Sequence, residues 1–410
     1  MKQAVSIVLT FILVALFTFF SVLPAGAQSG IELQDVVATV KFGERITFTA
    51  TIKSSIPIQS ISIILLDESQ GIRQIVPLRL DAGGRTEYVL DTKQTIIPPF
   101  SDLKWSYQVT LADGSSINSE IYSVRYADDR FAWQTLQSGS LRVSWYSGDA
   151  SFGQSALEAA QSGLASVSKL VAVDLAQPIE FYIYANANDL RATLREGDSE
   201  WIAGHADPAL GVVMVAIEPG ADQKALMQQR IPHELMHVMM SRAIGVGYEN
   251  IPAWLREGTA ALAETHPNPE YDRALADAAS GNQLIPLEGL CVSFPGDTGQ
   301  AFLAYAESRS FTSYLRDTYG STDILKLASL YAGGVDCQRG TELAFGDSLP
   351  ILEARWQSVA LGKFSFLPAL QNMTPYLVLL CLVLFVPLMG ILSSTRKKGS
   401  HNEPETFIRK

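Results

Sequence analysis

The residues with the clearest chemical potential are His233, Glu234 and His237, which lie in the run His-Glu-Leu-Met-His. If this run is helical, the two histidines leave the same face one turn apart, so both imidazoles can bind one metal ion. Glu234 is rotated by about 100° from His233, which keeps its carboxylate off the ion but beside a water that the ion holds. This is the position of the general base in a metal-dependent hydrolase.

A zinc site of this kind needs a third ligand. An extended pattern with a third histidine is excluded, because Met240 and Ala243 stand where it requires a glycine and a histidine. Glu257 is the candidate instead, since its run Trp-Leu-Arg-Glu-Gly opens a second apolar segment that ends at Glu264. Two histidines and one glutamate leave a fourth position open for water, as in catalytic zinc sites. Other divalent ions can use the same set, so the metal stays open.

Together these motifs resemble those of the gluzincin metallopeptidases, in particular the peptidase MA-like families. The resemblance rests on Pro-His-Glu-Leu-Met-His at 232–237 and Pro-Ala-Trp-Leu-Arg-Glu-Gly-Thr-Ala at 252–260, and it extends more loosely from about 133 to 356. It implies a zinc-dependent hydrolase of peptide bonds that acts on peptides or proteins. The residues that it assigns are the Zn²⁺ ligands His233, His237 and Glu257 and the catalytic base Glu234.

Three further residues have two interpretations each. The resemblance implies that Tyr305 is catalytic and donates its hydroxyl to the developing oxyanion, but an ordinary packed tyrosine is the alternative. Glu264 either accepts a proton from a ligand histidine or is a solvated glutamate at a helix end. His205, near a turn at Asp207, is interpreted as an exposed turn histidine rather than as a substrate contact.

The position of cleavage is inferred from an absent motif. The aminopeptidase relatives hold the free amine of their substrate with a Gly-x-Met-Glu-Asn segment, and no such run precedes His233. We therefore expect an endopeptidase. The alternative is a non-catalytic surface protein for adhesion or scaffolding, but a purely structural metal site has no use for Glu234.

Composition restricts the number of domains and the partners. A chain of 410 residues suggests two or three folded units, and 47% hydrophobic with 18% charged residues is more apolar than usual for a soluble protein. The net charge of −11 argues against nucleic acid as a partner, because a nucleic-acid-binding surface is basic.

The two ends of the chain are both apolar. Residues 1–27 have the pattern of a signal peptide with an Ala-Gly-Ala cleavage site, although an uncleaved anchor is the alternative. Residues 374–394 are interpreted as a transmembrane helix, and the basic run that follows predicts a cytoplasmic tail at 395–410. The expected protein is therefore a single-pass membrane protein whose catalytic domain is extracytoplasmic.

The segment 30–128 is typical of a β-sandwich. Apolar and polar residues alternate along Ile46–Ile52 and Leu103–Leu111, and turn signals at 81–84 and 113–114 separate the expected strands. Roughly seven strands in this length predict an immunoglobulin-like fold that serves as a spacer or a binding module.

The segment 131–362 is the expected peptidase domain. It begins with strands at 141–146 and 179–184 around a helix, and Gly204–Ile217 predicts two short strands that form the edge of the cleft in the resembled families. Mostly helices follow, at 271–279, 300–319, 322–331 and 349–361. Cys291 and Cys337 are expected to pair if the compartment is oxidising. The predicted fold class is thus α+β: a β-sandwich, a thermolysin-like gluzincin domain and a C-terminal transmembrane helix.

Overall fold

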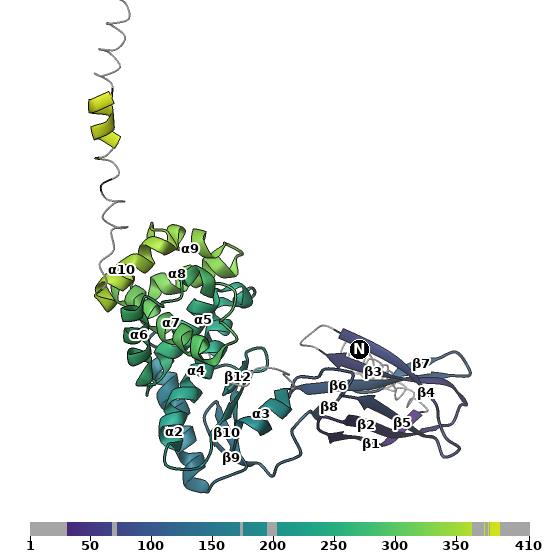
Figure 1. Cartoon of the computed structure of the whole chain (residues 1–410). Coiled ribbons are helices and arrows are strands. Elements are labelled where there is room, and N and C mark those ends of the chain that lie inside the picture. Colours follow the sequence, from purple (N-terminus) through teal and green to yellow (C-terminus); the bar gives the residue numbers. More distant parts are fainter. Residues whose placement is uncertain are drawn as a thin grey trace, which may run out of the picture. The chain divides into compact units, whose positions relative to one another are not determined.

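The computed structural model describes residues 31–67, 72–172, 175–194, 203–362, 373, 376 and 378–385 (Figure 1). The chain forms two compact units. The first consists of Met1–Thr135, Ser144–Ser147 and Ile183–Asp198, and the second of Leu136–Val143, Gly148–Tyr182 and Ser199–Lys410.

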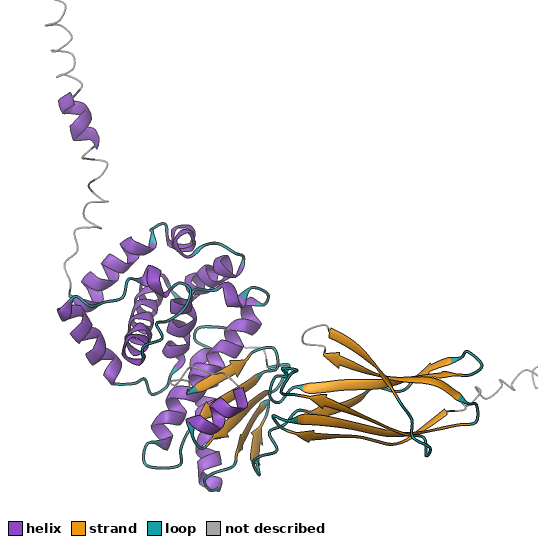
Figure 2. Cartoon of the chain, turned by 45° about the vertical axis from the view of Figure 1, so that its right-hand side comes forward, coloured by secondary structure: helices purple, strands orange, loops and turns teal. Residues whose placement is uncertain are grey.

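The first unit contains two sheets that enclose a common core (Figure 2). One sheet has the order β1-β2-β5, with bounds Ile31–Lys41, Arg45–Ser54 and Arg85–Asp91. The other has the order β4-β3-β6-β7, with bounds Ile72–Leu78, Ile58–Asp67, Asp102–Leu111 and Ser116–Asn118, and β8 (Tyr122–Arg125) also pairs with β6. The unit also includes helix α3 (Ala187–Leu194).

Alternating burial explains why these strands form a sandwich. Strand β2 buries every second residue, and strand β6 buries the apolar residues predicted from its alternation. Side chains from both sheets meet in the core, among them Phe48 and Trp105, whose rings lie 5.1 Å apart. Gly84 closes the predicted turn with φ of +77°, and a Cβ there would lie 2.6 Å from the carbonyl oxygen of Ile52. The sandwich predicted from the sequence is therefore supported.

The second unit begins with strands and continues with helices, as predicted. Its sheet has the order β12-β13-β11-β10-β9, with bounds Gly204–Asp207, Val212–Ala216, Ile179–Tyr184, Leu141–Trp145 and Gln134–Ser138. Strand β12 is thus an edge strand, and it pairs antiparallel with β13. The helices are α2 (Ala150–Val167), α4 (Gln223–Ile244), α5 (Ala253–Ala263), α6 (Glu270–Gly281), α7 (Thr298–Tyr319), α8 (Ser321–Ala332), α9 (Cys337–Phe345) and α10 (Leu349–Leu361).

Helix α4 lies at the centre of this unit. Its buried residues include Leu235, Met236, Val238, Met239 and Met240, which flank the two histidines. The helix continues through Pro232, and helix α2 packs against it at this point. A Cβ at Gly163 would lie 2.9 Å from the ring of Pro232, so a glycine is required for this close approach.

A disulfide bond joins Cys291 to Cys337, as expected, with their Cα atoms 6.1 Å apart. Cys337 is the first residue of α9, a helix that the sequence analysis does not predict. Asp336 caps α9 by accepting hydrogen bonds from the N–H groups of Gln338 and Arg339.

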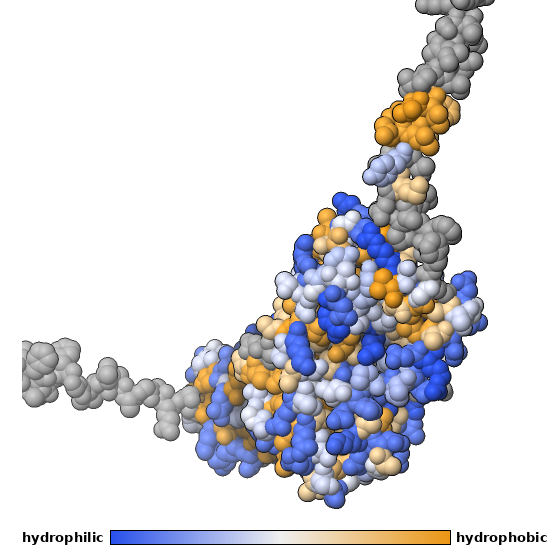
Figure 3. All heavy atoms as spheres, turned by 90° about the vertical axis from the view of Figure 1, so that its left-hand side faces the viewer, coloured by the Kyte–Doolittle hydropathy of each residue, from blue (hydrophilic) through white to orange (hydrophobic). Residues whose placement is uncertain are grey.

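The structure corrects the prediction of a membrane-spanning segment. Within the described ranges, no helix is both long and apolar enough to cross a membrane. Of the predicted span 374–394, the structure describes 376 and 378–385, which are helical, and the residues of 378–385 are apolar (Figure 3). The predicted transmembrane helix and single-pass localisation are thus wrong by this finding. The predicted signal peptide 1–27 and tail 395–410 lie outside the described residues.

Candidate metal centre

Helices α4 and α5 bring three metal-ligating side chains together. His233 Nε2 lies 3.2 Å and His237 Nε2 lies 3.6 Å from the same oxygen, Oε2 of Glu257. All three donor atoms lie within 4.8 Å of one another. The helical spacing sets the two imidazoles on one face of α4, and the packing of α5 against α4 supplies the carboxylate.

The charges of this cluster are coupled. Burial disfavours the carboxylate of Glu257, but the two imidazoles outweigh this effect and lower its pKa. Burial also disfavours the imidazolium of His233, but its hydrogen bonds to Glu257 and Glu264 outweigh this and raise its pKa well above the usual value. The site therefore has an electrostatic preference for positive charge between its donors.

The second nitrogen of each histidine is held by a hydrogen bond. His233 Nδ1 lies 3.0 Å from Oε1 of Glu264, and His237 Nδ1 lies 2.9 Å from the hydroxyl of Tyr248. The carboxylate of Glu264 favours a proton on Nδ1 of His233, and the hydroxyl of Tyr248 holds the orientation of the His237 ring, so the Nε2 atom of each histidine faces Glu257. Glu264 is almost completely buried, with a side chain 1% exposed, so it is not the solvated helix-end residue of the second interpretation.

Glu234 is buried beside the donor set without being part of it. A Cβ at Gly204, the first residue of edge strand β12, would lie 2.3 Å from Glu234 Oε1. The carboxylate thus lies directly against the backbone of the strand, and any side chain at position 204 would displace it. This close approach gives a physical reason for the glycine.

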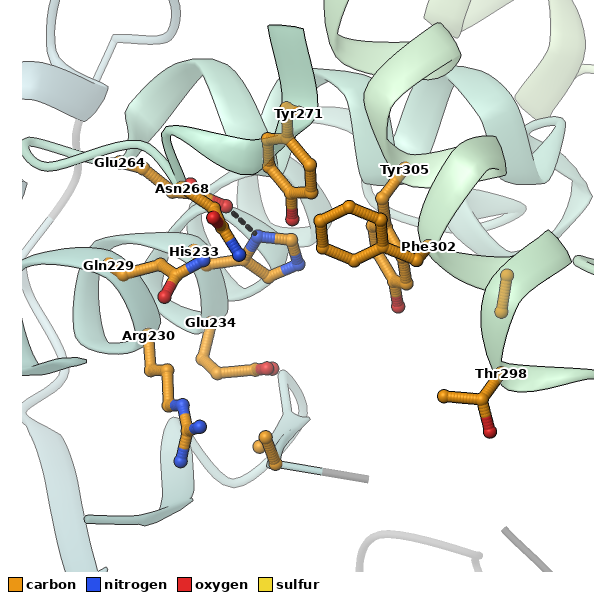
Figure 4. A pocket seen from close by; sticks show the side chains of 13 residues that line it. Gln229, Arg230, His233, Glu234, Glu264, Asn268, Tyr271, Thr298, Phe302 and Tyr305 are labelled. Carbon is orange, nitrogen blue, oxygen red and sulfur yellow. Dashed lines mark hydrogen bonds and ion pairs between the residues drawn. The ribbon is translucent and has the colours of Figure 1, made fainter. Parts of the chain in front are cut away.

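A cavity of about 280 Å³ opens beside His233 and Glu234 (Figure 4). Tyr305 of α7 lines it, and its ring centroid lies 6.0 Å from that of His233. Burial and the nearby carboxylates of Glu257 and Glu234 raise the pKa of Tyr305, so its hydroxyl keeps its proton. Tyr305 therefore lines the cavity beside His233 and Glu234 in a form that can donate a hydrogen bond.

A second cavity of about 290 Å³ lies on the side of His237. Its lining includes His205, which is half-buried within strand β12 and pairs with Met214 rather than lying in a turn. The interpretation of His205 as an exposed turn histidine is corrected accordingly. Arg256 also lines this cavity, forms an ion pair with Glu249 and lies 6.0 Å from the ring centroid of Tyr248.

Close packing of α5 on α7 fixes the third donor. A Cβ at Gly258 would lie 2.1 Å from Thr312 Oγ1 and 2.6 Å from the carbonyl oxygen of Ser308. The glycine that follows Glu257 thus lets the two helices approach closely. This contact accounts physically for the Glu-Gly pair of the motif.

Tyr248 and Gly204 belong to the site but are not marked as functional by the sequence. Tyr248 begins a short 3₁₀ helix, η1 (Tyr248–Asn250), and no local pattern marks it as the partner of His237. The signal for Gly204 was its place at the start of a predicted edge strand, but only the fold shows that Glu234 touches it.

The donor set fits a zinc ion. Two imidazole nitrogens and one carboxylate oxygen converge, and both histidines have the second hydrogen-bond partner that metal-ligating histidines usually have. Within the described part of the chain, the buried Oε2 of Glu264 has no hydrogen-bond partner, which leaves negative charge next to the cluster.

Comparisons with solved structures give low similarity. A carbohydrate-binding module of family 56, a β-1,3-glucan binding domain, is 17% identical, with 23% of this chain and 99% of that chain covered and a TM-score of 0.18. OgpA from Akkermansia muciniphila is 18% identical, with 23% of this chain and 28% of that chain covered and a TM-score of 0.20. A mutant M1 zinc metallopeptidase from Deinococcus radiodurans is 12% identical, with 80% of this chain and 94% of that chain covered and a TM-score of 0.35. Scores this low carry no argument about function.

The comparison of sequences is more informative. No curated protein matches this chain. Residues 159–362, however, match the family model described as the Peptidase MA superfamily. This range includes α4, α5 and α7, so the match supports a peptidase of the MA superfamily for the part of the chain that contains the candidate metal centre.

Proposed function

We propose that this protein is a zinc metallopeptidase that hydrolyses internal peptide bonds. The observation that carries the proposal is the convergence of His233, His237 and Glu257, whose donor atoms lie within 4.8 Å of one another. Glu234 lies beside this set, buried, where a purely structural metal site would not need a carboxylate. The family match over 159–362 supports the same class of reaction.

His233, His237 and Glu257 would hold the zinc ion, Glu264 would keep His233 in the ligating tautomer, and Tyr248 would orient the ring of His237. When bound, zinc supplies an activated water and polarises the scissile carbonyl group. Glu234 accepts a proton from the attacking water and donates it to the leaving amine. No covalent bond between the protein and the substrate is required.

Two other elements would position the substrate. Among the described residues, β12 has no strand partner on its outer side, so an extended peptide can add there as a further strand next to Glu234. Tyr305, protonated in the cavity, would donate a hydrogen bond to the oxyanion that forms from the carbonyl. Neither element needs a free terminus on the substrate, which favours cleavage within a chain.

Cleavage of casein and of labelled peptides tests the proposal. Peptides blocked at both ends separate cleavage within a chain from cleavage at its termini. We expect both substrates to be cleaved, a chelator to abolish cleavage and added Zn²⁺ to restore it. Absence of cleavage in zinc-loaded protein, or cleavage that a chelator does not affect, would overturn the proposal.

A further inference from the structure

Arg230 is a cationic residue that the proposed reaction leaves without a role. It lies one turn before Glu234 on α4 and lines the cavity that His233, Glu234 and Tyr305 also line. Burial lowers its pKa, against the opposing effect of Glu234, but a guanidinium remains charged at any physiological pH. The cavity therefore contains a partly desolvated positive charge next to the proposed base.

The guanidinium has spare donor capacity. Its Nη1 donates a hydrogen bond to the carbonyl oxygen of Ala216, the last residue of strand β13. Among the residues that the structure describes, its other N–H groups have no acceptor and no carboxylate pairs with it. A guanidinium carries five N–H donors in a fixed plane that matches a carboxylate. Arg230 is thus able to bind a further anionic group from the cavity.

Arg256, the arginine of the other cavity, provides a contrast. Its Nη1 forms an ion pair with Glu249, and its guanidinium lies over the ring of Tyr248. The charge of Arg256 is therefore balanced by the protein itself. The two cavities beside the metal centre differ in this respect: among the described residues, Arg256 has a carboxylate within ion-pair distance and Arg230 has none.

The cavity that Arg230 lines has a polar side and an aromatic side. Figure 4 shows Gln229, Arg230 and Asn268 on one side, and Phe302 and Tyr305 on the other. The amide groups of this lining can also donate to the oxygens of a carboxylate, while the aromatic rings contact the apolar part of the same side chain. This arrangement suits a short side chain that ends in a carboxylate.

We infer that Arg230 is a specificity residue that binds a carboxylate of the substrate close to the reacting bond. The carboxylate belongs either to an aspartate or glutamate side chain or to the free C-terminus of a peptide. This inference rests on the proposed peptidase function, because the cavity becomes a substrate subsite only if the bond is cleaved at Glu234. It adds the chemical class of substrate that the enzyme prefers.

A binding measurement tests the inference without requiring turnover. The protein carries Glu234→Gln, is loaded with zinc and is titrated into three pools of fluorescent random nonapeptides: central Glu with an amidated C-terminus, central Gln with an amidated C-terminus, and central Gln with a free carboxylate. We expect the first or the third pool to bind about tenfold more tightly than the second, as one charge-assisted hydrogen-bonded pair would give. The pool that binds more tightly identifies the source of the carboxylate.

Two further substitutions assign the preference to Arg230. Arg230→Gln should remove the difference between the pools, and Arg230→Lys should keep part of it. Arg242→Gln is the matched control, because Arg242 lies on the same helix and also donates to backbone carbonyl oxygens, those of Gln177 and Pro178, outside both cavities. Equal affinity for the three pools, or a preference that survives Arg230→Gln, would overturn the inference.

Cleavage kinetics separate this inference from the proposed function. With Glu234 intact, kcat/KM is measured on matched peptides that contain Glu or Gln near the cleaved bond. If no peptide is cleaved, the proposed function fails, while the binding pools still decide on Arg230. If Arg230 serves only to balance the charge of Glu234, Arg230→Gln lowers cleavage of both peptides equally, and the inference is contradicted.

Discussion

The two units of this protein bury charged groups in opposite ways. In the first unit, Asp128 is completely buried and fully engaged. Arg130 donates to both of its carboxylate oxygens at 2.7 Å and 2.6 Å, and the hydroxyl groups of Tyr184 and Thr193 donate to Oδ2 at 3.1 Å each. Every oxygen of this carboxylate has a partner, so the network stabilises the fold and has nothing left to offer a ligand.

At the candidate metal centre of the second unit, not every carboxylate oxygen has a hydrogen-bond partner among the described residues. Glu234, Glu257 and Glu264 are held close together around two imidazoles, and within the described residues Oε2 of Glu264 has no hydrogen-bond partner. Such an arrangement costs free energy unless a cation binds to it. Burial alone therefore does not distinguish a structural carboxylate from a functional one. The two differ in whether the protein supplies hydrogen-bond partners to all of their oxygens.

The largest expected effect is on catalysis. Glu234→Gln removes the proposed general base while keeping the size of the side chain, so peptide cleavage should fall by about 100-fold or more. Zinc content should not change, because Glu234 is outside the donor set. Cleavage rates and metal analysis on the same preparation check this prediction. Unchanged cleavage would remove Glu234 from the mechanism.

In the first unit, breaking the hydrogen-bond network around Asp128 should lower the stability of the fold rather than change catalysis. Asp128→Asn leaves the guanidinium of Arg130 without its ionic partner and should lower the free energy of unfolding by about 3 kcal/mol. Chemical denaturation measures the loss. The control is Asp102→Asn, which breaks a more exposed ion pair with Arg125 and should cost about 1 kcal/mol or less. A changed zinc content in Asp128→Asn would weaken the contrast between the units.

In the second unit, Glu264 should contribute to zinc affinity through its hydrogen bond to His233. Glu264→Gln removes the charge that holds Nδ1 of His233, so zinc affinity should fall by about 10- to 100-fold. Competition with a chelator of known affinity measures this change. Glu249→Gln is the control, because Glu249 is an exposed glutamate that pairs with Arg256. Equal affinities in the two variants would show that Glu264 does not support the ligand histidine.

The smallest expected effect concerns two carboxyl groups behind the site. Glu307 accepts a hydrogen bond from the N–H group of Ile285, and Glu353 accepts one from that of Leu287. Burial raises the pKa of Glu307 to about 8 and the pKa of Glu353 to about 7. The folded protein therefore holds protons that the unfolded chain has lost above about pH 4.5, so the free energy of unfolding decreases as the pH rises towards 8.

Substitution isolates this contribution. Glu307→Gln mimics the protonated carboxyl group and should reduce the loss of stability between pH 5 and pH 8 by roughly 1–2 kcal/mol. Denaturation of both proteins at the two pH values gives the comparison. If the loss is the same in the variant, Glu307 does not titrate in this range.

The sequence predicted those parts of the site that depend on local geometry. The spacing of His233 and His237 requires only a helix, and the strands of the sandwich follow from alternation such as that of β2. Glu257 was a candidate from the sequence, but its place beside the histidines depends on how α5 packs on α4. Tyr248 could not be found, since its contact with His237 is tertiary and no pattern precedes it.

Two errors have physical reasons of their own. Helix α9 has nine residues, of which the buried ones are Gly340 and Thr341, so no apolar face marks it in the sequence, although Asp336 before it and Gly346 after it are typical capping residues. The predicted membrane helix was based on the apolar composition of 374–394, whereas no helix in the described ranges is both long and apolar enough to cross a membrane.

Zinc content tests the central claim most directly. Purified full-length protein, the variant Glu257→Ala and the control Glu249→Ala are dialysed against the same zinc buffer and their metal is quantified. One zinc ion per chain in the wild type and the control, with most of it lost in Glu257→Ala, is the predicted result. Equal zinc in all three proteins, or none in the wild type, would contradict a metal site made by His233, His237 and Glu257.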